Sequence, residues 1–543
     1  MILRNSLNFI SQLFTDTLNQ LRNIYLNSSY YDKKISKIHF DNLFYRPSPH
    51  LLSSLIKYQT KKINVDDIST ENLWDNKNIN SKDFKKLNNF YWFFSLDLKS
   101  SKKNTHKIVS SWIKKNSKYN GKSWEFDSTS KRIIAWLSCH NLTIEESNKD
   151  YQDQFNGMIQ KQCNHLMNEI TGSKIIDDKM IGCAAIILVG LCYKDENNYL
   201  TYGLNLLKKI SKFAFDNHGF PKSRSIKQLI FYLKYFILIR EWFRESHIDV
   251  PDQVNETIYY LGQGYAFIWQ NIEFDILMNG NNLSNNVELD HYLKRLGYKF
   301  KNTNKEFGGY AILQNKKISL VMDVGPTPIS KLSTNYQSGA LSIEICYGGK
   351  KLISNCGYYS NKNLKLMELS KSTATHSTLT IDDNSSCQYR KIDNKNYYIN
   401  DNLKILKKNI VFEKNYWKIN ASHDGYKKKY DTIHEREIEF YPEQLKFVGT
   451  DKILSKKTNF NIKFDVRFHF EPNVKLMKTQ DNKTILIELE DVGWKFTCDD
   501  YDINIDNGLY FGNKNSYTQN QNILISGITN NQSENIIWQL SKI

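Results

Sequence analysis

A short stretch in the last third of the chain holds side chains that could exchange protons with a substrate. His423, Asp424 and Tyr426 lie within four residues of one another, with a glycine among them. Imidazole and phenol groups act as general acids and bases when their surroundings adjust the pKa. Glycine beside polar residues indicates a turn. We therefore predict Tyr426 as proton donor or base, with His423 alongside.

Two arginines follow on segments whose alternating pattern predicts strands. Arg436 comes two residues after His434, and Arg467 precedes His469 by two, so each pair shares one face of its strand. Guanidinium groups bind carboxylates through paired hydrogen bonds. If these strands are neighbours, Arg436 or Arg467 can clamp a carboxylate near Tyr426. The same alternation fits a polar face turned to solvent, and a histidine in a β-rich domain is more often a hydrogen-bonded structural residue.

The elements that must position these side chains change character near residue 305. Between about 84 and 298, apolar residues recur every three to four positions, which predicts helices. After 305 they alternate in short stretches between Gly, Asn and Lys turns, which predicts strands. Helices followed by strands indicate segregated domains. We predict an N-terminal helical or irregular extension over 1–83, a helical domain over 84–304 and an antiparallel β-domain over 305–543.

Composition limits the class of protein and of partner. The 543 residues, 40% of them hydrophobic, suit a globular chain with more than one domain. A net charge of +17 favours polyanions, and both nucleic acid and acidic polysaccharide fit it. The sequence has no zinc-finger spacing, no phosphate-binding glycine loop and no continuous basic helix, so we expect no nucleic acid. A Lys-rich solvated surface is the simpler alternative.

Cysteine spacing and the N-terminus bear on the compartment. The eight cysteines contain no CxxC pair, which predicts buried thiols and not a disulfide framework. Polar residues interrupt the apolar stretch over 1–21, so we expect an amphipathic helix there and no secretory signal. The longest apolar run, 181–193, is shorter than the roughly 20 residues of a membrane span. We expect no membrane span, and the compartment stays open.

A series of motifs resembles the heparinase II/III-like family. The strongest is STATHSTLTIDD, within residues 371–383. Two more stretches, 130–137 and 216–225, resemble the helical domain of the same family. The other segments are VMDVGP at 321–326, GALSIEICYGGKKLISNCG at 339–357, SHDGY at 422–426, IHEREI at 433–438 and RFHFEP at 467–472. The resemblance covers most of the chain and implies an (α/α) toroid followed by a large antiparallel β-sandwich.

The resemblance also implies an activity, a partner and a location. Members of the family carry out β-elimination on uronate-containing acidic polysaccharides, such as glycosaminoglycans, without an organic cofactor. The reaction needs a neutralised carboxylate, a base and an acid. Lys222 and Arg224, in the loop 216–225, would line the cleft between toroid and sandwich, or simply be solvated. The family implies the bacterial cell envelope or periplasm, with the cytoplasm as the alternative because no export signal is evident.

Several positions depart from the family's catalytic pattern. An Asn-His pair at a helix start aligns with Thr-Gly-Ser-Lys at 171–174. A catalytic tyrosine aligns with Ile226, which cannot transfer a proton. A strand that supplies a catalytic and a zinc-binding histidine has Asn335 and Gln337 at these positions. The usual acid and base are therefore substituted.

The family's zinc site is also altered. Its aspartate aligns with Asn355, and only His376 is retained. Zinc prefers imidazole, thiolate or carboxylate ligands, so one histidine with two amides is a poor site. We predict no metal here, and a hydrogen-bonded cluster of Gln337, Asn355 and His376 in its place. His376 stays a catalytic candidate and Gln337 a substrate-binding one.

Two functions are compatible with these residues. The first is a polysaccharide lyase that uses Tyr426, His423 and His376, with Arg436, Arg467, His469, Lys222, Arg224 and Gln337 as substrate-binding residues. The second is a catalytically impaired protein of the bacterial cell envelope that binds anionic glycans, since a fold does not fix an activity. The sequence leaves open the polysaccharide, the cleavage mode and the oligomeric state.

Overall fold

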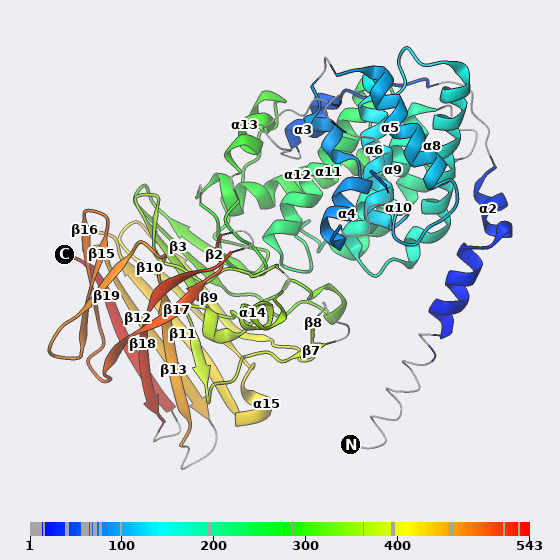
Figure 1. Ribbon diagram of the computed structural model, residues 1–543. Helices are drawn as coiled ribbons and strands as arrows, with labels where there is room; N and C mark the ends of the chain where they lie inside the picture. The colour runs from blue at the N-terminus through cyan, green and yellow to red at the C-terminus, as the bar shows by residue number, and fades with distance from the viewer. Residues whose placement is uncertain are drawn as a thin grey trace. The chain divides into compact units, whose positions relative to one another are not determined.

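The computed structural model of the chain divides into two compact units (Figure 1). The helical unit comprises residues 1–213 and 232–258, and the β unit comprises 214–231 and 259–543. The structure describes residues 14, 17–37, 43–55, 65, 68, 73–74, 79–97, 100–193, 198–272, 274–284, 286–361, 363–391, 397–455, 461–513, 516–529 and 533–543.

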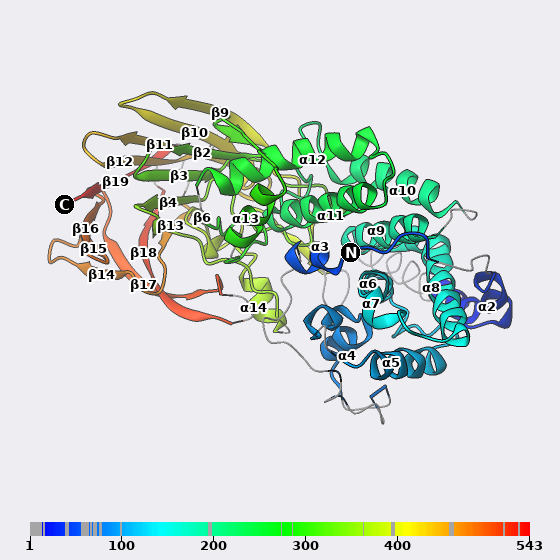
Figure 2. The ribbon, with the colours of Figure 1, turned by 90° about the horizontal axis from the view of Figure 1, so that it is seen from above.

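Helices with buried apolar stripes build the helical unit. In α5 (Lys102–Lys115), Ser101 caps the first turn and Ile108, Trp112 and Ile113 are buried. Helix α9 is buried on all sides from Met180 to Cys192. Figure 2 shows α5, α8 and α10 outside α6 and α9. The helices outside the β-sheets are α2 Ser29–Ile35, α3 Pro49–Leu55, α4 Ser81–Asn88, α6 Phe126–Ser138, α7 His140–Thr143, α8 Lys149–Glu169, α9 Ile176–Cys192, α10 Tyr199–Ala214, α11 Ile226–Glu245, α12 Asp252–Tyr265 and α13 Val287–Arg295.

The β unit contains antiparallel sheets. The main ones have five strands in the order β1-β2-β3-β4-β5, eight in the order β14-β15-β16-β19-β12-β11-β10-β9, and four in the order β17-β18-β13-β6; β7 and β8 form a pair. The strands are β1 Glu306–Phe307, β2 Tyr310–Gln314, β3 Ile318–Asp323, β4 Ile343–Tyr347, β5 Lys350–Ile353, β6 Leu379–Ile381, β7 Tyr389–Lys391, β8 Tyr397–Ile399, β9 Ile405–Phe412, β10 Trp417–His423, β11 Thr432–Tyr441, β12 Lys446–Ser455, β13 Lys463–His469, β14 Lys475–Lys478, β15 Thr484–Leu489, β16 Val492–Thr497, β17 Ile503–Tyr510, β18 Thr518–Ile528 and β19 Ser533–Lys542. Two short helices, α14 Leu364–Leu369 and α15 Lys427–Tyr430, lie between strands.

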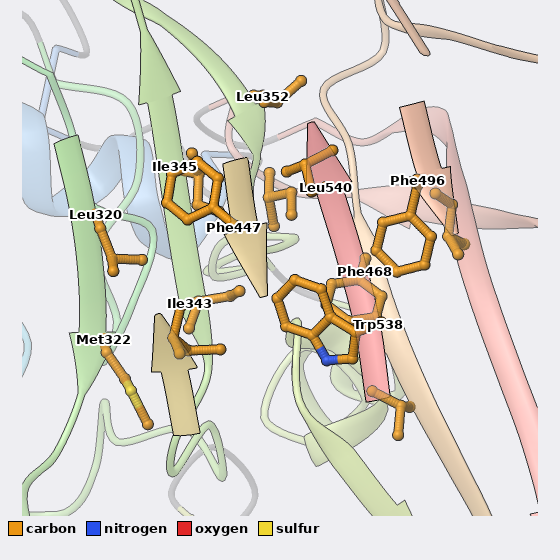
Figure 3. Packing of buried hydrophobic residues seen from close by; sticks show 14 of the residues in the cluster. Leu320, Met322, Ile343, Ile345, Leu352, Phe447, Phe468, Phe496, Trp538 and Leu540 are labelled. Carbon is orange, nitrogen blue, oxygen red and sulfur yellow. The ribbon is translucent and has the colours of Figure 1, made fainter. Parts of the chain in front are cut away.

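One hydrophobic core joins the sheets of the β unit. Leu320 of β3 and Ile343 of β4 come from the five-stranded sheet. Phe447 of β12 and Trp538 of β19 come from the eight-stranded sheet, and Phe468 of β13 comes from the four-stranded one. Figure 3 shows these side chains packed together, and all five are fully buried. Inward apolar residues from several sheets are what a β-sandwich requires.

The predicted change from helices to strands near residue 305 is confirmed. Helix α13 ends at Arg295 and the first strand begins at Glu306. The division into domains at 83 and 304 stays a prediction. At the N-terminus, residues 17–26 are helical, whereas 1–13 lie outside the described residues. All eight cysteines are free and buried, as their spacing predicts. None of the helices within the described residues has the length and apolar character that crossing a bilayer requires.

Candidate functional site

A tight loop in the β unit exposes an imidazole and an ammonium group. The carboxylate of Asp216 accepts hydrogen bonds from the backbone N–H groups of His218 and Phe220, both at 2.9 Å. Gly219 has φ +77°, and a Cβ there would come within 2.3 Å of Tyr260. These contacts fix the backbone and leave the side chains of His218 and Lys222 exposed. The loop can therefore offer a proton-exchanging group and a positive charge to a ligand.

Arg224 is buried and anchors this loop through contacts in the interior of the β unit. Its guanidinium donates to Asp323 Oδ1 at 2.6 Å and to the carbonyl oxygens of Gly309 and Gly325 at 2.9 and 3.1 Å. Its own carbonyl accepts from the Tyr310 hydroxyl at 2.6 Å. Arg224 is 6% exposed and Asp323 is 1% exposed. Arg224 was predicted to bind substrate, but all of these contacts are internal.

Gly325 gives a direct test of this anchor. A Cβ at Gly325 would lie 2.4 Å from Cζ of Arg224, so Gly325→Ala displaces the guanidinium from Asp323. We expect a loss of about 2–4 kcal/mol in the free energy of unfolding, because a buried ion pair is disrupted. Gly493→Ala is the control, since its nearest neighbour would be 3.6 Å away. Urea unfolding with equal losses for the two variants would contradict the assigned anchor.

His423 and His434 begin a buried chain of hydrogen bonds in the eight-stranded sheet. They are direct cross-strand partners on β10 and β11. The Gly425 N–H donates to His423 Nδ1 at 3.0 Å, so the proton of His423 must be on Nε2. His423 Nε2 lies 3.3 Å from His434 Nδ1, and His434 Nε2 lies 2.8 Å from Asp451 Oδ1. Each imidazole thus donates to the next group, and both are neutral.

Asp451 on β12 is the acceptor at the end of this chain. Arg436 donates to its two carboxylate oxygens at 2.7 and 3.0 Å, and Trp538 Nε1 donates at 3.1 Å. Burial raises the pKa of Asp451, but the Arg436 charge and the His434 hydrogen bond outweigh it and hold this pKa well below its ordinary value. Burial lowers the pKa of His423 and of His434. Asp451, His434 and Arg436 are all 0% exposed.

Tyr426 lies beside this chain and is also internal. Its ring centroid is 5.7 Å from that of His423, as predicted for neighbours in a turn. The hydroxyl donates to the Leu379 carbonyl at 2.9 Å, and the residue is 1% exposed. Burial raises the pKa of Tyr426 far above its ordinary value. The predicted proton transfer to a substrate needs access that this arrangement does not provide, and the role stays a prediction.

Gln337, Asn355 and His376 lie in the interior but are not hydrogen-bonded to one another. Gln337 donates to the carbonyls of Gly357 and Ser370, and its own carbonyl accepts from the Gly280 N–H. Asn355 donates to Glu344 and accepts from the Ser377 N–H. The predicted cluster is therefore corrected to three residues that each bind their own surroundings. Main-chain groups and the Glu344 carboxylate satisfy these amides, as expected for buried polar groups.

A zinc ion does not fit this group of residues. The amides of Gln337 and Asn355 are fully engaged. His376 Nδ1 donates to the Ser372 carbonyl at 2.9 Å, which leaves the buried Nε2 as one free imidazole ligand. Within the described residues, no three His, Cys, Asp or Glu side chains gather as a metal site. One imidazole is too few for zinc.

His469 and Arg467 lie on β13, in the four-stranded sheet, and not beside β10 and β11. His469 is 2% exposed, and its Nε2 donates to the Ala374 carbonyl at 3.0 Å. Arg467 donates to Asp465 at 3.1 Å and to Thr380 at 3.0 Å, with 18% of its side chain exposed. Of the predicted carboxylate clamps, Arg436 is internal and Arg467 is partly accessible.

Most of the β unit is similar to a known domain family. Residues 304–539 match the family described as heparinase II/III-like, C-terminal. The matched residues make up less than half of this chain. The matched range contains the series of hydrogen bonds that runs from Gly425 to Asp451, and it also contains the residues around His376.

Solved structures share the fold of the whole chain. A heparinase III gene product matches with a TM-score of 0.69, 14% identity, and coverage of 90% of this chain and 87% of that chain. Heparan sulfate lyase HepC from Pedobacter heparinus matches with a TM-score of 0.65 and 12% identity, over 86% and 78% of the two chains. These likenesses confirm the predicted fold class, a helical N-terminal region followed by an antiparallel β-sandwich, and the toroidal arrangement of the helices stays a prediction.

A curated relative matches part of the chain. FtsZ-localized protein C from Caulobacter vibrioides is 23% identical over 248 residues. The match spans 43% of this chain and 42% of that protein. Less than half of the relative's length is thus represented, and its name says nothing yet about the activity of this chain.

Three residues of the β unit were not predicted from the sequence. His218 provides the exposed imidazole of the loop 216–225. Asp451 accepts the hydrogen bonds of Arg436 in the interior. Lys371 is 1% exposed, donates to the Tyr336 carbonyl at 3.3 Å, and has its pKa lowered by burial to about 7. His218 could have been found, because it lies within the loop 216–225 that carries the resemblance.

Proposed function

We propose that this protein binds uronate-containing acidic polysaccharide without cleaving it. The observation that carries this proposal is the burial of the predicted proton-transfer group: Tyr426 and His423 are 1% exposed and Arg436 is 0% exposed. A polymer in water cannot reach side chains whose polar atoms are already paired inside a sheet. The positions that align with the family's catalytic tyrosine and catalytic histidine are also substituted, by Ile226 and Asn335.

Binding is supported by the loop that remains accessible. Lys222 offers an ammonium group to a carboxylate, and His218 offers an imidazole that can donate a hydrogen bond to a hydroxyl. The net charge of +17 concentrates polyanions near the surface. The solved structures named as heparinase III and heparan sulfate lyase act on acidic chains by their printed names, and we carry that substrate class over as a ligand class.

The second candidate function is β-elimination. It is favoured by the exposed His218, which can act as base without any rearrangement of the buried hydrogen bonds between His423, His434 and Asp451. In this case Lys222 would neutralise the uronate carboxylate. New ultraviolet absorbance from an unsaturated uronate that disappears in His218→Gln would support this candidate over the first.

We place the protein in the bacterial cell envelope, as its fold family suggests. The relative FtsZ-localized protein C is named for a location with FtsZ, which favours the cytoplasm as the second choice. A fluorescent fusion expressed in the native host distinguishes envelope from cytoplasm. A uniform signal in the cytoplasm would contradict our placement.

The binding proposal is tested on the loop itself. We expect His218→Gln/Lys222→Gln to weaken binding of a polyuronate oligosaccharide about tenfold, because a charge and a donor are lost. The matched control is His291→Gln/Lys299→Gln, which removes the same groups from exposed positions of the β unit. Titration calorimetry in which the loop variant binds as tightly as the control would overturn the role of the loop.

A further inference from the structure

The helical unit contains a basic pocket that the proposed loop site does not use. It has a volume of about 670 Å³ and lies between α5 and the start of α8. Figure 2 shows α5 on the outside of this unit. We define the basic pocket by Lys103, His106, Lys107, Lys114 and Tyr151, which are among its lining residues.

Three lysines direct unbalanced charge into this pocket. Lys103, Lys107 and Lys114 are spaced by four and seven residues, so they share one face of α5. Like charges four residues apart destabilise a helix slightly, and a bound anion would relieve this repulsion. Within the described part of the pocket only Lys102 is ion-paired, with Glu145 at 3.4 Å and Glu146 at 2.6 Å. The three other lysines are exposed, and none of them is ion-paired within the part of the chain that the structure describes.

His106 supplies a second, independent feature of the basic pocket. Its ring packs against that of Tyr151 in a tilted arrangement, with centroids 4.6 Å apart. Its Nε2 is buried and has no hydrogen-bond partner among the described residues. Burial and the nearby Lys102 charge lower the pKa of His106. A buried polar atom without a partner is uncommon in folded proteins and indicates a missing ligand or water.

We propose that the basic pocket is a second binding site for acidic polysaccharide, where the three lysines hold an anionic sugar group next to His106. The inference rests on the proposed function and adds a site in the other unit of the chain. Two sites on one chain increase the avidity for a polymer that reaches both.

Nucleic acid fits the pocket less well. Single-stranded nucleic acid binds through aromatic side chains on which bases stack. Here the two rings, His106 and Tyr151, pack against each other, and Tyr151 is 8% exposed. The pocket therefore offers charge but no free platform for a base.

The test uses the full-length protein with heparin and polyuronate oligosaccharides as probes. Lys103→Gln/Lys107→Gln removes two charges from the pocket, and Lys208→Gln/Lys209→Gln removes two from exposed positions of α10. We expect the pocket variant to bind a long chain about tenfold more weakly and the control variant to bind nearly normally. The charge reversal Lys107→Glu should weaken binding further.

The outcomes separate this inference from the proposed function. Equal binding by the pocket and control variants, with tight binding by the unaltered protein, overturns the pocket and leaves the loop site standing. If the unaltered protein binds neither probe, the proposed function fails and the pocket fails with it. An equal loss of binding to a single-stranded DNA oligonucleotide would show unspecific charge attraction and also overturn the pocket.

Discussion

Replacing Arg436 with methionine is expected to lower the free energy of unfolding by about 3–5 kcal/mol. The change leaves Asp451 charged and buried without its guanidinium partner, which is the costly way to break an internal ion pair. It also removes the donor of the Leu341 and Ser377 carbonyls, now bonded at 3.0 and 2.6 Å. Urea unfolding, followed by tryptophan fluorescence, measures the loss.

Two controls separate burial from charge in this prediction. Lys475→Met removes one partner of an exposed pair with Glu488 and should change stability little. Arg436→Met/Asp451→Leu should recover part of the loss, because no unpaired charge remains. If Arg436→Met is no more harmful than Lys475→Met, Arg436 is not the internal residue described above, and a role in carboxylate binding becomes open again.

The protein is expected to lose stability steeply below about pH 6. Burial lowers the pKa of His376 to about 4 and that of His469 to about 3, and it lowers those of His423 and His434 as well. Because these values lie below the ordinary 6.5, the unfolded chain binds more protons, so stability is complete above pH 6.5 and falls with pH. Four such groups give at most about 5 kcal/mol per pH unit between pH 6 and 5.

The two units should differ in this acid response. In the helical unit, burial lowers the pKa of His165 to about 3 and also lowers those of His106 and His140, which destabilises the fold as pH falls. Burial and neighbouring carboxylates raise the pKa of Asp178 to about 7, and this acts in the opposite direction. The β unit, with four buried histidines, should therefore unfold first. Limited proteolysis between pH 7 and 5, mapped by mass spectrometry, identifies the unit that opens.

A matched pair of variants checks the acid prediction. His376→Asn places an amide where the Nδ1 donor was, so it should keep the bond to Ser372 and reduce the pH slope by about a quarter. His291→Gln alters an exposed histidine and should leave the slope unchanged. A melting temperature that is constant from pH 7 to 5 would contradict the assignment of neutral internal histidines.

The strands and their turn could be predicted because side-chain alternation is a local property. The turn from His423 to Tyr426 and the strand pairs follow from it, and the structure pairs His423 with His434. The same alternation also indicates that the Arg436 side chain points inward. Along β11, His434, Arg436, Ile438 and Phe440 alternate on one face, and all four are buried. A charged residue in phase with apolar ones indicates an internal ion pair.

The partner of Arg436 could not be predicted, because it depends on the register of a neighbouring strand. Arg436 faces Asp451 across β11 and β12, which an unaligned sequence does not specify. The anchor between Arg224 and Asp323 joins residues 99 positions apart in the chain. His218 is exposed only because the Asp216 bonds and Gly219 fix the loop. Each of these features depends on tertiary contacts, which the residue types alone do not reveal.

The most direct test of the central claim is a titration of the full-length protein with a panel of uronate polysaccharides, followed by ultraviolet absorbance of the same samples over many hours. We predict saturable binding of at least one polysaccharide and no absorbance from unsaturated uronate. Absorbance that grows with time and with protein concentration would contradict the account, because it requires an accessible acid and base that the buried Tyr426 and His423 do not provide.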